Sequence, residues 1–141
     1  MKSKLILMIV ILFILVPVVR AEDEIIKIGL VDNSKQVLIG AQDGVRVLTN
    51  DGQKLNLNAQ SSYKLKKKDS LIYLNDKVLR VKNMLIWPQG KGNLITVNGR
   101  KYRGYIEVLH QREGFNIINH VKFSDYLASV VGSEINPSWP M

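Results

Sequence analysis

The amino-acid sequence predicts a mainly β protein with a short C-terminal helix, and two patterns carry this prediction. Residues 24–119 contain short segments in which apolar and polar residues alternate, as at 45–48, and turn dipeptides such as Asn98-Gly99 separate the segments. Residues 123–132 instead have apolar residues at every third or fourth position, which is typical of a helix. Strands this short and this regularly spaced favour an antiparallel sandwich or barrel.

The expected strands follow one another closely along the β-rich part of the chain. They are placed at residues 25–31, 37–40, 45–48, 55–57, 63–66, 78–81, 84–87, 94–97, 102–109 and 115–119. Asp43-Gly44 and Asn98-Gly99 are predicted to be hairpin turns, because glycine adopts positive φ at little cost. A dense lysine cluster is interpreted either as an anion-binding surface or as the charged, solvated edge of a sheet; its members are Lys64, Lys66, Lys67 and Lys68.

The pattern changes to a helix near residue 122. Ser124 is expected to cap the first free amides, Asp125 to complement the positive end of the helix dipole, and Gly132 to end the helix. The helix has one apolar face, formed by Phe123, Tyr126, Leu127, Val130 and Val131. This helix and the turn after it are assigned to residues 122–141, as the start of an α+β domain.

The N-terminus has the three-part form of a secretory signal peptide, predicted over residues 1–21. Two lysines precede an uncharged apolar run of 15 residues, 5–19, and Ala21 occupies a position that a signal peptidase reads. As a helix this run would span only ~22 Å, which is short of the ~30 Å hydrocarbon core of a membrane. A cleavable signal is therefore favoured over a retained membrane anchor. We expect an exported protein of the cell envelope or extracellular space, with residues 22–141 as one domain.

Composition excludes several kinds of site. The sequence has no cysteine, which excludes disulfides, thiolate metal sites and lipid attachment after the apolar run. His110 and His120 have no companions at metal-ligand spacing, so neither a metal nor a cofactor is predicted. Removing residues 1–21 takes away three positive charges and lowers the formal charge from +8 to +5. The expected anionic partners are wall polymers rather than nucleic acid, and a membrane only if the signal segment is retained.

Residues 126–140 read Tyr-Leu-Ala-Ser-Val-Val-Gly-Ser-Glu-Ile-Asn-Pro-Ser-Trp-Pro. This segment resembles the signature of the stage II sporulation protein D family, also called the SpoIID/LytB or amidase-enhancer domain. Upstream residues 102–119 are also similar. The sequence departs from the signature at Ser124, Ser129 and Ile135, which stand where the family has an acidic residue, a glycine and a methionine. The family continues with a further helix after the signature, so we expect this sequence to be the N-terminal portion of a longer domain.

The resemblance implies work on peptidoglycan, since some members of the family are lytic transglycosylases and others enhance cell-wall amidases. The family's catalytic glutamate falls on Glu134, which would protonate the glycosidic oxygen. A transglycosylase closes the sugar's own hydroxyl onto the anomeric carbon, so one carboxyl group is enough. Ser133 and Trp139 are the candidate substrate-binding residues. Trp139 would either stack on a sugar ring or anchor the next helix in the core.

Three hypotheses about function stay open from the sequence. The chain is either part of a lytic transglycosylase with Glu134 as general acid, or a non-catalytic module that binds peptidoglycan glycan strands or enhances a cell-wall amidase. The third hypothesis is an inactive truncated remnant, in which the apolar face of the C-terminal helix would be left exposed.

Overall fold

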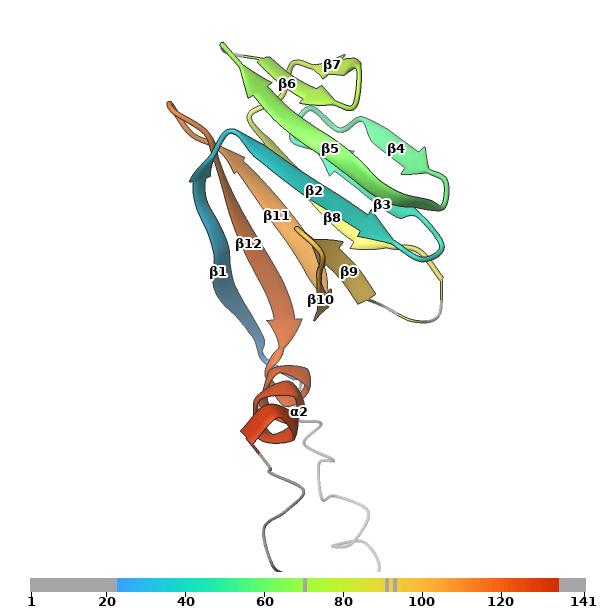
Figure 1. Ribbon diagram of the computed structural model, residues 1–141, viewed down its shortest axis with the longest axis vertical. Coiled ribbons are helices and arrows are strands. Elements are labelled where there is room, and N and C mark those ends of the chain that lie inside the picture. The colour runs from blue at the N-terminus through green and yellow to red at the C-terminus, as the bar shows by residue number, and fades with distance from the viewer. Residues whose placement is uncertain (1–22, 70, 91, 93, 135–141) are drawn as a thin grey trace, which may run out of the picture.

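The computed structural model describes residues 23–134 except residues 70, 91 and 93, and its strands form two six-stranded antiparallel sheets (Figure 1). Sheet A has the order β1 (Ile25–Ser34), β12 (Phe115–Lys122), β11 (Tyr105–His110), β8 (Asn83–Pro88), β3 (Val45–Thr49) and β4 (Lys54–Leu57). Sheet B has the order β10 (Arg100–Arg103), β9 (Leu94–Val97), β2 (Gln36–Ala41), β5 (Gln60–Lys68), β6 (Leu71–Leu74) and β7 (Lys77–Leu79). Helix α2 (Phe123–Glu134) follows β12. The predicted mainly β fold class with a short C-terminal helix is confirmed.

The hydrophobic core lies between the two sheets and follows from the alternation in the sequence. Successive side chains of a strand point to opposite faces, so alternate residues are buried in strands such as β3, β8, β9 and β11. The largest fully buried side chains come from both sheets; they are Phe115, Ile39, Leu65, Ile72, Met84, Ile86, Ile95, Ile106 and Ile117. The intervening residues form the two outer faces of the sandwich.

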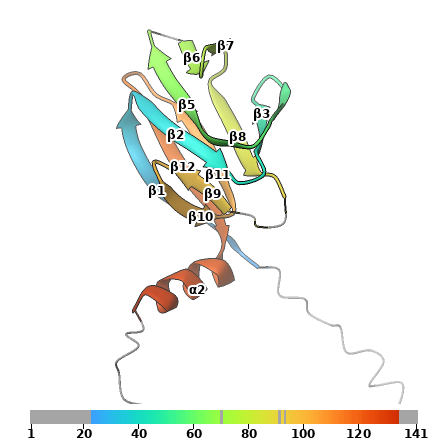
Figure 2. The same cartoon turned by 45° about the vertical axis from the view of Figure 1, so that its right-hand side comes forward.

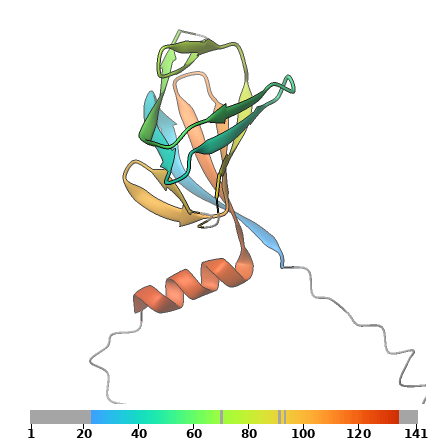
Figure 3. The ribbon, with the colours of Figure 1, turned by 90° about the vertical axis from the view of Figure 1, so that its right-hand side faces the viewer.

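The first and the last strand lie side by side. In β1 and β12, Ile25 pairs with Lys122 and Ile28 with Asn119, so both strands leave the sandwich at the same end (Figure 1). The backbone amide of Phe123 donates to the carbonyl of Glu24 at 2.8 Å, which extends this pairing to the first residue of α2. Helix α2 then leads away from that end (Figures 2 and 3). This pairing decides where the C-terminal helix starts.

The two predicted hairpin turns have different outcomes. Asn98-Gly99 joins β9 to β10, with Val97 opposite Arg100, so this prediction is confirmed. The chain also turns at Asp43-Gly44, where the Gly44 amide donates to the Ala41 carbonyl at 3.1 Å. However, β2 belongs to sheet B and β3 to sheet A, so this turn carries the chain between sheets. The hairpin prediction there is wrong, because local turn chemistry does not determine which strands pair.

Other strand predictions need smaller corrections. The strand predicted at 102–109 is divided at Gly104 into β10 and β11, which belong to different sheets. Gly104 has a φ of 87°, and a Cβ added there would collide with the carbonyl oxygen of His120. The residue therefore lets the crossing chain pass directly against β12. Strand β6, Leu71–Leu74, was not predicted, because its four residues show no alternation of apolar and polar types.

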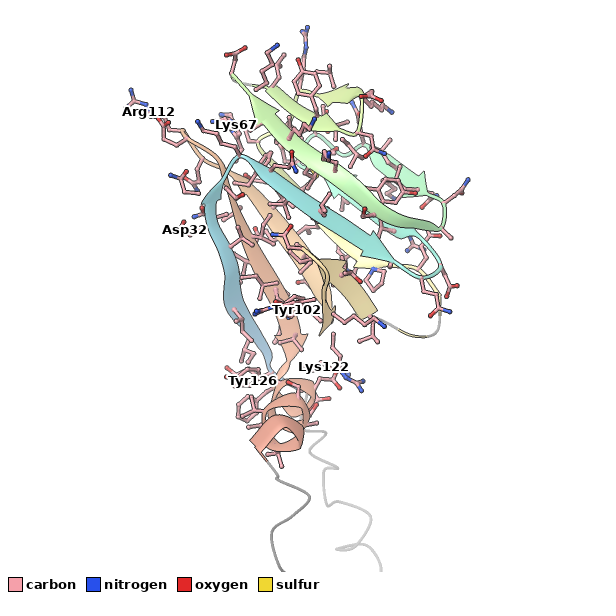
Figure 4. The ribbon with its side chains drawn as sticks, viewed as in Figure 1. Asp32, Lys67, Tyr102, Arg112, Lys122 and Tyr126 are labelled. Atoms are coloured by element: carbon pink, nitrogen blue, oxygen red, sulfur yellow. The ribbon has the colours of Figure 1, made fainter. Side chains whose placement is uncertain are left out.

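The lysine cluster does not lie on a sheet edge, which corrects that interpretation. Strand β5 is paired on both sides, with β2 and with β6. Lys67 sits at the end of the sandwich, where its ammonium group donates to the carbonyl of Gln111 at 2.5 Å and to the carbonyl of Arg112. Figure 4 shows Lys67 and Arg112 at the end opposite to α2. Since Arg112 is in the β11–β12 turn of sheet A, Lys67 links the two sheets.

Helix α2 differs from its prediction at both ends. It begins at Phe123, so Ser124 lies inside the first turn, and it continues through Gly132, which does not end it. The predicted apolar face is present but faces solvent, with Phe123, Leu127 and Val131 between 43% and 51% exposed. An ion pair at 3.6 Å between Arg103 and Asp125 joins the helix to β10. No helix in the described part of the chain is long and apolar enough to span a membrane.

We predict that Gly104→Ala destabilises the protein more than Gly99→Ala does. Both glycines have nearly the same positive φ, 87° and 82°, but an added Cβ has open space at Gly99 and meets the His120 carbonyl at Gly104. The conformational cost alone is about 1 kcal/mol, and the collision adds about 1–3 kcal/mol. Urea unfolding of the two variants measures the difference. Equal losses of stability would contradict the close approach of Gly104 to β12.

A second prediction concerns the half-buried His110, whose Nε2 has no hydrogen-bond partner. Burial, with a contribution from the nearby Lys67 ammonium, lowers the pKa of His110 below its ordinary value. Below pH ~6.5 the unfolded chain therefore binds a proton that the folded chain does not, and stability falls as the pH falls toward the folded pKa. Unfolding between pH 7.5 and 5.5 should show a shallower decline for His110→Gln than for the wild type. Parallel pH profiles would exclude this role for His110.

Candidate functional site

The outer face of sheet A carries a transverse row of side chains, one from each strand, which we call the outer row. In the order of the sheet from β4 to β1, the outer row is Asn56, Arg46, Trp87, Tyr105, His120 and Lys27. The pairing places Arg46 opposite both Asn56 and Trp87, and His120 opposite both Tyr105 and Lys27. Their neighbours along the strands, such as Ile86 and Ile106, are buried, so the row projects away from the core.

Three rings are stacked in the middle of the outer row. The ring centroids of Trp87 and Tyr105 are 5.2 Å apart with an interplanar angle of 29°, and those of Tyr105 and His120 are 4.6 Å apart at 18°. These are favourable stacking distances for aromatic pairs. Tyr105 covers the face of Trp87 that is turned toward β11. The other face of the indole is therefore directed toward β3, where Arg46 lies.

A contact with the half-buried carboxylate of Glu107 holds the last ring of this stack. Nε2 of His120 lies 2.7 Å from Oε2 of Glu107, and the side chains are only 7% and 21% exposed. Because a carboxylate accepts hydrogen bonds, this contact places a proton on Nε2 of His120. The imidazole ring is thereby fixed in orientation, and Tyr105 and then Trp87 stack on it in turn. Glu107 thus positions the aromatic rings without belonging to the outer row.

Two hollows adjoin these rings, and Trp87 and Pro88 line both of them. The larger hollow, of about 990 Å³, lies over β3, β4 and β8, and Arg46, Lys54 and Asn56 contribute to its lining. The smaller hollow, of about 290 Å³, is lined by Tyr105 and His120 and also by Lys122 and Asp125. An aromatic wall with amide and cationic side chains around it suits a polar ligand that has one apolar face.

The smaller hollow reaches helix α2, since Asp125 is in the first turn of that helix. Figure 4 shows Lys122 just before α2 and Tyr126 on α2 itself, at the end of the sandwich where β12 leads into the helix. The outer row and the beginning of α2 are therefore parts of one surface. The signature segment at residues 126–140 begins within this helix of 12 residues, so the helix connects the segment to the aromatic rings.

The sequence-predicted site residues lie at or beyond the far end of α2. Ser133 and Glu134 are its last two residues by backbone, and their side chains fall outside the described part of the structure. Trp139 lies outside the described residues altogether. The described residues contain no group of three or more His, Asp or Glu side chains that could hold a metal ion. The Glu107–His120 pair thus has no third ligand among them.

The outer row was not among the predicted sites. From the sequence, Trp87 is only the last residue of an expected strand, 84–87, and His120 is a histidine without companions at metal-ligand spacing, whereas both belong to the ring stack. Trp87, Tyr105 and His120 all lie at outward-facing positions of their strands, but Leu85 and Ile118 share this face, so the alternation of residue types gives no clear signal for the row. Recognising the row requires knowing that β8, β11 and β12 are neighbours in that order, which single-strand patterns do not reveal.

Comparison of the chain with protein-family models, with curated proteins and with solved structures gives no match. The resemblance to the stage II sporulation protein D family therefore rests on the residues of the signature itself.

Proposed function

We propose that this chain is an exported protein of the cell envelope that binds peptidoglycan glycan strands through the outer face of sheet A. The observation that carries the proposal is the indole of Trp87, which is stacked on Tyr105 and lines the larger hollow. Pyranose rings have an apolar face of C–H groups that stacks on aromatic rings, while their hydroxyl groups hydrogen-bond to amide and charged side chains. The hollow offers both kinds of partner.

Charge and sequence support the same proposal. With the predicted signal peptide removed, the formal charge is +5, and the polymers that a protein meets in a cell wall are mostly anionic. The segment 126–140 resembles a signature of peptidoglycan-active proteins, and it begins in the helix that adjoins the smaller hollow. A glycan strand bound along the outer row would pass close to this helix. The same binding would also hold the chain on the substrate of a cell-wall amidase.

The proposal predicts that Trp87→Ala and Tyr105→Ala each weaken binding to purified peptidoglycan by about tenfold, since a stacked ring contributes about 1–1.5 kcal/mol. Tyr73→Ala is the matched control, because Tyr73 is a half-buried tyrosine on the outer face of sheet B, opposite Lys66. Sedimentation of the protein with insoluble peptidoglycan measures binding. Unchanged binding in both variants of sheet A, or an equal loss in the control, would reject the outer row as the glycan site.

A second candidate function is lytic transglycosylase activity with Glu134 as general acid, and the specific observation in its favour is the signature at residues 126–140. We predict that the wild type releases anhydro-sugar ends from glycan strands stripped of stem peptides. Replacing a general acid costs roughly 10²–10⁴ in rate, so Glu134→Gln should lose almost all of this activity. Equal activity in the two proteins would remove Glu134 from the mechanism. Inactivity of both would reject this candidate and leave the binding proposal in place.

A further inference from the structure

We infer that the larger hollow holds an acidic group of the glycan against Arg46 and Lys54, so that the ligand is an anionic polysaccharide rather than a neutral one. This inference rests on the proposed function and names the class of glycan. It depends on two cations of neighbouring strands, β3 and β4, which line the hollow beside Trp87.

The register brings the two cations together. Arg46 is opposite Asn56, and Lys54 is two residues before Asn56 on the same face of β4. Arg46 and Lys54 are therefore diagonal neighbours, whose Cα atoms in such an arrangement are about 7–8 Å apart, within reach of two long side chains. Both residues are exposed. A single anionic group above this pair can contact both of them.

Neither cation is neutralised within the described part of the protein. The four ion pairs found there involve Arg103, Arg112, His120 and Lys122 as the basic partners, and none includes Arg46 or Lys54. Two like charges on adjacent strands repel each other, and a bound anion removes this repulsion. The hollow thus carries the two positive charges of Arg46 and Lys54, which an anionic ligand would balance.

Two carboxylates lie near the ends of the hollow: Asp51, in the β3–β4 turn before Lys54, is hydrogen-bonded to Thr49 and Gln53, whereas Asp43 lies at the other end, beside Gly90. Asp43 packs against Gly90, where its side chain occupies the place that a Cβ would take. Gly90 is two residues after Pro88, which is opposite Val45. Lys54 is opposite Leu48, which is three residues further along β3 than Val45. An acidic group of a ligand is therefore favoured at the end formed by Arg46 and Lys54 and disfavoured beside Asp43.

The floor of the hollow offers a further donor. The side-chain amide of Gln89 donates to the carbonyl of Val45 at 3.2 Å and to Oδ1 of Asn56 at 3.5 Å. Because Oδ1 of Asn56 accepts this hydrogen bond, the remaining donor of Asn56 is its amide nitrogen. Guanidinium, ammonium and amide donors together match an acceptor-rich group, and the planar fork of arginine suits a carboxylate or a phosphate.

The position of Trp87 sets the distance between the acidic group of the ligand and the sugar ring that stacks on the indole. Arg46 is directly opposite Trp87 in the register, and strands are about 4.8 Å apart. A sugar ring on the indole would therefore present one of its own substituents, or the linkage to the next unit, to Arg46. Two sources supply such a group in wall polymers: a carboxylate carried by an amino sugar, and a phosphodiester between units.

The test compares four probes by calorimetry on the full chain without its signal peptide. They are a neutral N-acetylglucosamine tetramer, a peptidoglycan oligosaccharide with free sugar carboxylates, the same oligosaccharide with these groups amidated, and poly(glycerol phosphate). The charge-removing variant is Arg46→Gln/Lys54→Gln. The control is Lys66→Gln/Lys68→Gln, which removes two exposed charges from the outer face of sheet B.

We expect the wild type to bind an acidic probe at least about tenfold more tightly than the neutral tetramer, as charge-assisted hydrogen bonds predict. The Arg46→Gln/Lys54→Gln variant should lose this preference and bind acidic and neutral probes within about twofold of each other, whereas the control variant should keep the preference of the wild type. Preference for the carboxylate probe or for the phosphate probe identifies the source. Equal binding of neutral and acidic probes by the wild type, or a preference kept by the variant, overturns this inference alone. Failure of the wild type to bind any probe overturns the proposed function as well.

Discussion

The pairing of β1 with β12 is the constraint on which the rest of this structure depends. It joins the first and the last strand of the sandwich and makes β12 an inner strand of sheet A, between β1 and β11. His120 can then contact Tyr105 on one side and lie opposite Lys27 on the other. The same pairing ends at Phe123, whose amide is bonded to Glu24, and so places α2 beside the rings of the outer face. Without it β12 would be an edge strand, and His120 and the start of α2 would lie at the open edge of the sheet.

Both the outer row and the core arise because successive side chains of each strand point to opposite faces of the sheet. The central strands β3, β8 and β11 of sheet A bury alternate residues, and what remains on the other face is free to be polar or aromatic. What distinguishes this face from an ordinary solvated one is the way its rings are held. The half-buried Glu107 fixes His120, and each following ring stacks on the one before it, so that the indole at the end of the stack is preorganised. Preorganisation matters for a ligand such as a sugar, which gains little from each contact.

The sequence was sufficient for the fold class and for most of the strands, because alternation and turn residues are local properties. Asn98-Gly99 was correctly assigned to a hairpin, since the two residues join strands that pair with each other. Asp43-Gly44 has the same local chemistry, but it joins strands of different sheets, and only the packing of the core decides between these outcomes. Gly104 was not recognised as a crossing point for the same reason. The candidate site depends entirely on the order of the strands in sheet A. Trp87 and His120 are 33 positions apart in the sequence, and β11 lies between their strands.

The adjacent ends of the sandwich also determine how the domain would carry a mechanical load. Ile25 and Lys122 face each other where both strands leave the sandwich. Tension between the chain before β1 and helix α2 would therefore act across the strands, on this pair first and then on the next, so that the hydrogen bonds open one at a time. Strands that are pulled along their length must instead break many hydrogen bonds together. A domain bound to glycan by its outer face and pulled through both ends would release β1 first, at low force, while Trp87 and Tyr105, on β8 and β11, keep their neighbours.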